Sequence, residues 1–181
     1  EASIEVAAVT LAQARYTGRE NMVVIPCAVT DRKRLAMIMA DSGSSNRFVF
    51  DEKSERQKYT FEPVLTDTLD SLLRHLDRLD LIKIDIEGRE GSALRGAEKL
   101  LERFRPKIVG EHWFVDELVA RDYEMTVLSP GAPVPVGQDV AALKDHCTNG
   151  VYIDIFFSPR EAAFVLADTR PRRHVFAGDS P

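Results

Sequence analysis

Three charged residues lie in LIKIDIEG, an otherwise apolar stretch that ends in a turn. They are Lys83, Asp85 and Glu87. A carboxylate at the end of a buried strand can accept a hydrogen bond from a substrate hydroxyl, remove a proton or hold a cation. Alternatively, Asp85 or Glu87 caps the helix that follows Gly88, because carboxylates stabilise helix N-termini. We favour a functional role, since a second polar pair follows the next predicted strand.

That second pair is Glu111 and His112, which follow the apolar run KIVG. In a parallel sheet the carboxyl ends of neighbouring strands lie side by side, so this pair is expected beside Asp85. His112 is a candidate general base, metal ligand or structural histidine. Lys83 is interpreted as a counter-charge for Glu111 or Asp85 rather than as a catalytic amine, because an unpaired ammonium is costly to bury.

Metal binding is a rival interpretation of the same residues. Carboxylates and imidazole suit a divalent ion, and the candidate ligands are Asp85, Glu87, Glu111 and His112. A single DxE pattern is weak support for a metal site, so no metal ligands are assigned.

Helical and strand patterns alternate along the chain. Helices are predicted over residues 2–16, 65–81, 90–104, 115–120 and 140–146, and strands over 22–29, 81–86, 107–113, 123–128 and 150–157. Residues 32–59 are interpreted as an excursion beside the core that forms a hairpin, and 159–181 as a short helix and a tail. The alternation predicts an α/β fold with a mostly parallel, buried sheet covered by helices on both faces. Ligands of such sheets bind at the carboxyl ends of the strands.

The composition is that of a soluble globular domain. The chain has 181 residues, a formal net charge of -5 and 44% hydrophobic residues. An acidic balance argues against nucleic acid or anionic lipid as a partner and favours a small molecule. The two cysteines have no CxxC spacing, and no apolar run approaches the roughly 20 residues that span a bilayer, so a cytoplasmic location is expected.

Four separated segments resemble one family. KIDIEGREGSALRGAEKLL followed by IVGEHW, together with NMVVIPCAVTD, VLTDTLDSLL and TNGVYIDIFFSP, is similar in sequence and order to the FkbM family of S-adenosylmethionine-dependent methyltransferases. The resemblance covers roughly residues 1–157. It implies a class I, Rossmann-like methyltransferase fold and methyl transfer, usually to a hydroxyl oxygen of a sugar, lipid or other small metabolite.

The resemblance also implies roles for individual residues. The cofactor-binding set for S-adenosylmethionine would be Glu1, Ala28, Val29, Asp31 and Asp85. In the catalytic set, Asp85 and His112 would handle the proton of the acceptor, and Glu87 and Glu111 would orient the acceptor or close the site.

The chain departs from the family pattern in one respect. The family begins with a strand and a glycine-rich turn that holds the methionine part of the cofactor, whereas these 181 residues contain no GxG. Residues 1–158 are therefore expected to be the C-terminal two-thirds of a methyltransferase domain without its first strand. Two alternative functions stay open, a divalent-metal-dependent α/β enzyme and a non-catalytic methyltransferase-like binding domain.

Overall fold

The computed structural model describes residues 2–19, 21–40, 47–49, 60–86, 88–129, 132–147 and 153–160. The helices are α1 (Ile4–Tyr16), α2 (Leu69–Leu72), α3 (Glu90–Arg95), α4 (Glu98–Phe104), α5 (Val115–Val119) and α6 (Val140–His146), with a 3-10 turn η1 (His112–Phe114). The strands are β1 (Ala28–Val29), β2 (Arg34–Ala40), β3 (Arg47–Val49), β4 (Thr60–Asp67), β5 (Leu81–Lys83), β6 (Lys107–Gly110), β7 (Tyr123–Leu128), β8 (Val134–Gly137) and β9 (Asp154–Pro159).

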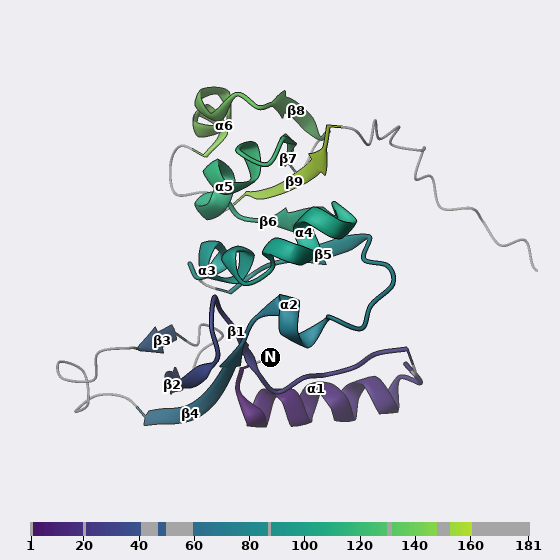
Figure 1. Ribbon diagram of the computed structural model, residues 1–181, viewed down its shortest axis with the longest axis vertical. Helices are drawn as coiled ribbons and strands as arrows, with labels where there is room; N and C mark the ends of the chain where they lie inside the picture. Colours follow the sequence, from purple (N-terminus) through teal and green to yellow (C-terminus); the bar gives the residue numbers. More distant parts are fainter. Residues whose placement is uncertain are drawn as a thin grey trace, which may run out of the picture.

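The described strands form two sheets. One has four strands in the order β1-β4-β2-β3, and the other has five in the order β5-β6-β9-β7-β8. Figure 1 shows the four-stranded sheet with α1 at one end of the molecule and the five-stranded sheet with α5 and α6 at the other. The fold is thus mixed α/β, with α2, α3 and α4 in the middle of the molecule (Figure 1).

The expectation of a mostly parallel sheet is wrong. Among the described strands, only β1 with β4 and β5 with β6 pair in parallel. The other pairings are antiparallel, because β2 runs beside β3 and β4, and β9 lies between β6 and β7. Within the predicted excursion, β2 and β3 pair antiparallel.

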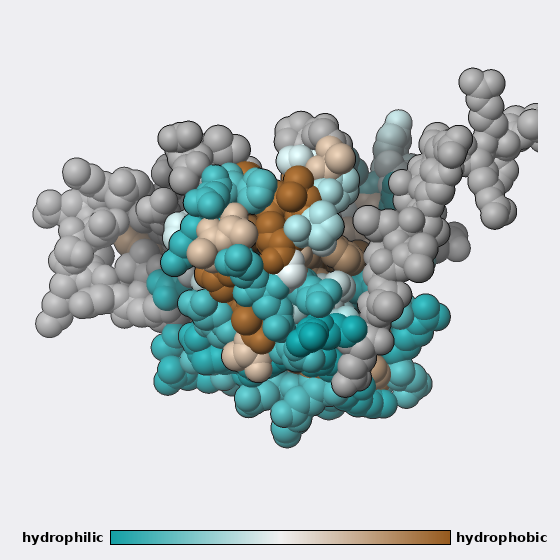
Figure 2. Space-filling model, turned by 90° about the horizontal axis from the view of Figure 1, so that it is seen from above, coloured by the Kyte–Doolittle hydropathy of each residue, from teal (hydrophilic) through white to brown (hydrophobic). Residues whose placement is uncertain are grey.

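The larger hydrophobic core belongs to the five-stranded sheet. Its centre holds the fully buried rings of Phe114, Tyr123 and Phe157, and the Phe114 and Phe157 ring centroids are 5.3 Å apart. The four-stranded sheet has a smaller cluster of buried residues, which are Ala28, Ala36, Ile38 and Val64. Figure 2 looks onto the α6 and β8 end of the molecule and shows a band of apolar surface bordered by hydrophilic residues.

The predicted strand over residues 22–29 is wrong for most of its length. Only Ala28 and Val29 form a strand, and Val23 is 84% exposed instead of buried. The reason is that β1 pairs with β4 through these two residues alone, so the preceding segment has no described ladder to join. Pro26 also has no N–H to donate to a ladder.

The predicted helix over residues 65–81 is replaced by the end of β4 and the short helix α2. Leu65 pairs with Leu35 in the antiparallel ladder between β4 and β2, which takes it out of the helix. Thr68 is the N-cap of α2, and its side chain accepts a hydrogen bond from Ser71 N.

The predicted helix over residues 90–104 is broken into α3 and α4. A Cβ atom on Gly96 would lie 2.2 Å from Thr30 O, so the chain passes too close to the four-stranded sheet for any other residue. Beyond the break, Asp70 of α2 accepts hydrogen bonds from the backbone N–H groups of Lys99 and Leu100. A side chain from another helix therefore caps the start of α4.

The remaining elements differ in their ends. The strand predicted over residues 107–113 ends at Gly110, and the chain then enters η1. The strand β8 is not predicted by the sequence patterns. No helix among the described residues is long and apolar enough to cross a membrane. The tail predicted over residues 159–181 lies outside the described residues after Arg160.

Candidate functional site

Lys83 is the centre of a charged cluster at the carboxyl end of β5. Its Nζ atom lies 2.7 Å from Asp154 Oδ1 and 3.7 Å from Asp85 Oδ2. Asp154 comes from the start of β9, which runs antiparallel to β6 and therefore begins where β5 and β6 end. All three side chains are about half exposed, at 46%, 57% and 48% for Lys83, Asp85 and Asp154.

This cluster confirms the interpretation of Lys83 as a counter-charge, although its closer partner was not predicted. The hydrogen bond to Asp154 raises the pKa of Lys83 and outweighs the opposing effect of partial burial, and the charges of Asp85 and Glu111 act in the same direction. Lys83 therefore stays an ammonium ion at neutral pH and cannot serve as an amine base. Asp154 could have been found from the sequence only by reading its strand as antiparallel to β6.

Glu111 and His112 follow directly after β6. Glu111 Oε2 accepts a 2.7 Å hydrogen bond from Trp113 Nε1, and the His112 ring lies 4.2 Å from the Trp113 ring at an angle of 33°. Trp113 is 55% exposed, so one indole ring contacts both predicted residues and still faces solvent. Trp113 is not among the residues predicted for the site, although an exposed aromatic ring beside polar groups can stack on a ligand.

The chain turns sharply between β6 and η1. A Cβ atom on Gly110 would lie 2.6 Å from Phe114 Cζ and 2.9 Å from Ile84 O. The missing side chain thus lets the Phe114 ring pack over the strand end, which fixes the direction in which Glu111 and His112 leave the sheet.

Asp85 does not cap α3. The N-cap of α3 is Arg89, which makes no side-chain capping hydrogen bond, and the carboxylate of Asp85 faces Lys83. The backbone N–H groups of Ile86 and Gly88 instead donate to Glu90 Oε1 at 3.1 and 3.2 Å. Glu87 lies outside the described residues, so its predicted role stays a prediction.

The predicted cofactor residues Ala28, Val29 and Asp31 lie in β1 or just after it, at a second polar cluster. Ala28 is 2% exposed and Val29 is half-buried. Asp31 pairs with Arg32, with Arg32 Nε 3.2 Å from Asp31 Oδ1, and this hydrogen bond lowers the pKa of Asp31. The backbone N–H of Asp31 donates to Ser92 Oγ at 3.3 Å, which joins the end of β1 to α3. Glu1 lies outside the described residues.

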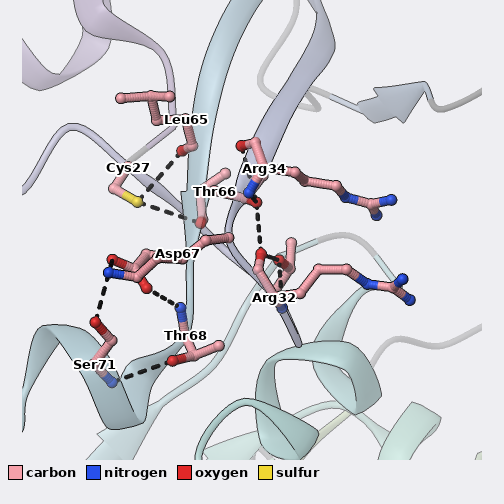
Figure 3. Close-up of polar contacts among 11 residues, drawn as sticks. Cys27, Arg32, Arg34, Leu65, Thr66, Asp67, Thr68 and Ser71 are labelled. Atoms are coloured by element: carbon pink, nitrogen blue, oxygen red, sulfur yellow. Dashed lines mark hydrogen bonds and ion pairs between the residues drawn. The ribbon is translucent and has the colours of Figure 1, made fainter.

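Figure 3 shows how this second cluster connects β4 to the turn before β2. The buried Thr66 hydroxyl donates to Arg32 O at 2.7 Å and accepts from Arg34 N at 3.0 Å. Asp67 accepts from Thr68 N at 2.7 Å and pairs with Lys33 at 2.9 Å. Burial acts to raise the pKa of Asp67, but these partners outweigh it and lower the pKa. The cluster thus holds the end of β4 against the turn before β2, mainly through hydrogen bonds to backbone groups.

The candidate metal ligands are not gathered into a metal site in the described part of the chain. No group of three or more His, Cys, Asp or Glu side chains is placed there to hold an ion. Glu87, one of the four candidates, is not among the described residues, so a metal site that includes Glu87 stays a hypothesis.

A mixed α/β fold that gathers carboxylates at the carboxyl ends of two parallel strands is typical of small-molecule enzymes. The family model of the methyltransferase FkbM domain matches residues 2–128, and the chain belongs to that family. No curated protein and no solved structure matches this chain. The family resemblance drawn from the sequence motifs is therefore confirmed over residues 2–128, whereas the segment TNGVYIDIFFSP lies outside the match, and the family implies a methyl donor.

Proposed function

We propose that this protein is an S-adenosylmethionine-dependent methyltransferase that methylates a hydroxyl oxygen of a small metabolite, sugar or lipid. The observation that carries the proposal is the cluster of carboxylates around Lys83 at the carboxyl ends of β5 and β6, in a chain of the FkbM family. Methyl transfer needs few protein groups beyond those that align the acceptor and accept its proton.

The chemistry of these strand ends fits the cofactor. S-adenosylmethionine has a positive sulfur, an ammonium group and ribose hydroxyls, all of which favour carboxylate partners. Asp85 and Asp31 would supply such partners, and Ala28 and Val29 would offer apolar contact for the adenine. When bound, S-adenosylmethionine supplies a methyl group on a positively charged sulfur, the leaving group of an in-line displacement.

The residues of the chain divide the remaining work. Asp85 is 57% exposed and accepts the proton or hydrogen bond of the attacking hydroxyl, while the Lys83 ammonium keeps the local carboxylates partly neutralised. His112 shares the proton-handling role. Glu111, oriented by the Trp113 indole, and Glu87 position the acceptor. The exposed Trp113 ring gives a flat apolar surface on which a sugar or other metabolite can stack.

Cofactor binding also requires the strand and glycine turn that the family resemblance implies. We propose that strands of this further part of the domain pair with β1 and with β5, each of which is the last strand of a described sheet. Large apolar side chains near both edges support this, because Val23 is 84% and Leu81 54% exposed. Unpaired edges with apolar side chains are unusual in isolated sheets. Strands in this position would complete the class I arrangement.

The test combines binding and turnover on the longest natural form of the protein. Calorimetry with S-adenosylmethionine and S-adenosylhomocysteine measures cofactor binding, and transfer of labelled methyl groups to a panel of hydroxylated metabolites measures activity. We expect Asp85→Asn and His112→Ala to lower turnover by about a hundredfold. Asp116→Asn, on the exposed face of α5, is the matched control.

Three results would contradict the proposal in different ways. No cofactor binding would favour the non-catalytic binding domain. Activity lost on exhaustive chelation would favour the metal-dependent enzyme. Wild-type turnover in both variants would remove Asp85 and His112 from the catalytic set.

A further inference from the structure

Glu90 is a buried carboxylate that sequence analysis did not single out. It is the first residue of α3 and only 1% exposed. Its Oε1 atom accepts hydrogen bonds from Ile86 N at 3.1 Å and Gly88 N at 3.2 Å. Its Oε2 atom is buried and has no hydrogen-bond partner among the described residues. One oxygen thus holds two backbone groups while the other is left unsatisfied.

A buried oxygen without a hydrogen bond lowers the stability of the fold, so helix formation alone does not explain a buried glutamate at this position. Burying a carboxylate costs free energy unless its oxygens are fully hydrogen-bonded. Glu98 occupies the matching first position of α4, yet its side chain is 63% exposed and lies 3.3 Å from Arg121. An acid at the start of a helix therefore does not need to be buried in this fold.

The two amides that Glu90 holds belong to the turn next to the proposed catalytic groups. The turn begins directly after Asp85 and contains Gly88, whose φ is +85°. Glycine adopts positive and negative φ angles about equally readily, so its own backbone preferences restrain Gly88 poorly. The hydrogen bonds to Glu90 provide the restraint, and they tie the turn to the buried end of α3.

We propose that Glu90 is a positioning residue of the methyltransferase site, acting through the backbone N–H groups of Ile86 and Gly88 and not through its charge. The inference rests on the proposed function, because it concerns how Asp85 is presented to a ligand. Reach and acceptor capacity matter in this role, whereas a negative charge does not. Glu90 differs in this from the exposed carboxylates, which can contact ligands directly.

Two substitutions separate reach from charge. Glu90→Gln keeps the length of the side chain and an oxygen acceptor but removes the charge. Glu90→Asp keeps the charge but shortens the side chain by one methylene group, which draws the oxygen away from Ile86 N and Gly88 N. Glu98→Asp is the matched control at the start of α4.

Two readouts are measured for each variant of the longest natural chain. Amide hydrogen exchange of Ile86 and Gly88 without ligand reports on the turn, and calorimetry with S-adenosylhomocysteine reports on the site. We expect Glu90→Asp to expose both amides to exchange and to weaken binding by about tenfold to a hundredfold, because small displacements of a site are costly. Glu90→Gln and Glu98→Asp should resemble the wild type in both readouts.

Two outcomes would overturn the inference. If Glu90→Gln weakens binding as much as Glu90→Asp while the amides stay protected, Glu90 acts through its charge. If Glu90→Asp leaves both amide protection and affinity unchanged, it positions nothing. Failure of the wild-type protein to bind S-adenosylhomocysteine would instead refute the proposed function, and the amide exchange of the two variants would still decide whether Glu90 holds the turn.

Discussion

The Lys83 ammonium lies among carboxylates that come from three different parts of the chain. Asp85 follows β5, Glu111 follows β6, and Asp154 begins β9. Such a cation keeps several acids close together without requiring any of them to take up a proton. At the scale of single residues, it explains how a lysine at the end of an apolar strand can belong to the proposed ligand-binding edge.

Replacement of Asp154 tests this arrangement. The pKa of Lys83 is raised in the folded protein, so the pair stabilises the fold at neutral pH and the effect is lost as pH rises through that raised pKa. We expect Asp154→Asn to lower the free energy of unfolding by about 0–1 kcal/mol at pH 7, because both side chains are nearly half exposed. Urea denaturation at pH 7 and in strong alkali measures the difference, which should vanish in alkali.

Asp80→Asn is the control for this pH dependence. Asp80 pairs with Arg78 at 2.8 Å, and an arginine keeps its charge throughout the accessible pH range. The effect of Asp80→Asn should therefore not disappear where that of Asp154→Asn does. Equal effects of Asp154→Asn at both pH values would show that Lys83 is not its relevant partner.

The residues of the candidate site that depend on local spacing are predictable from the sequence. Lys83 ends β5 and Asp85 follows two positions later, so their proximity follows from their spacing along the extended chain. Asp154 was missed because its place depends on which strands pair and in which direction. Glu90 was missed because acids are common at helix starts, and only the folded chain shows that this one is buried.

Helices α2, α3 and α4 show how contacts between elements override a local pattern. The apolar spacing over residues 90–104 suits one continuous helix, yet the chain breaks at Gly96. There the backbone lies against Thr30 O, Asp70 N donates to Gly96 O at 2.9 Å, and the Asp70 carboxylate caps α4. The break joins the two sheets through backbone contacts that no period in the sequence reveals.

Gly96→Ala tests this junction. The new Cβ atom would meet a backbone oxygen at 2.2 Å, so either α3 or the Thr30 segment must move. We expect a loss of about 1–3 kcal/mol in the free energy of unfolding, measured by urea denaturation.

Gly91→Ala in α3 is the matched control. Its Cβ atom would meet only the ends of two flexible side chains, Glu117 Oε1 at 3.0 Å and Arg95 Nη1 at 3.5 Å. Alanine also favours a helix more than glycine does, so this variant should be neutral or more stable. Equal stability of the two alanine variants would contradict the close packing at Gly96.

The element types were mostly predictable because periodicity and turn residues report on local structure. Pairing was not, since β9 joins the sheet between β6 and β7, far from its neighbours in sequence order. The helix predicted over residues 65–81 failed for a related reason, because pairing with β2 draws Leu65 into β4.

At the scale of the whole molecule, β5 lies at the edge of the five-stranded sheet as far as the described strands go, and this position leads to a prediction about backbone exchange. Ile84 N donates to Val109 O at 2.8 Å on the β6 side. Because amides alternate in direction along a strand, Lys83 N–H points to the open side. In the 181-residue chain we expect the Lys83 amide to exchange much faster than the Ile84 amide, as measured by NMR. A form of the protein that binds S-adenosylhomocysteine should protect both.

Comparable protection of both amides in the 181-residue chain would contradict the open edge. Slow exchange at Ile84 serves as the internal control, since it shows that β5 and β6 are paired in the sample. The comparison therefore separates an unpaired strand edge from general unfolding of the sheet.

The position of β9 also determines when the five-stranded sheet can be completed during synthesis of the chain. β9 is the last described strand along the chain, yet it lies in the middle of the five-stranded sheet, between β6 and β7. The β7 and β8 hairpin contains no residue from later in the chain, but β7 joins the rest of the sheet only through β9, which ends at Pro159. The family match ends at residue 128, before this strand. A nascent or truncated chain that stops at residue 128 contains the segment matched by the family model but lacks β9, the middle strand of the five-stranded sheet.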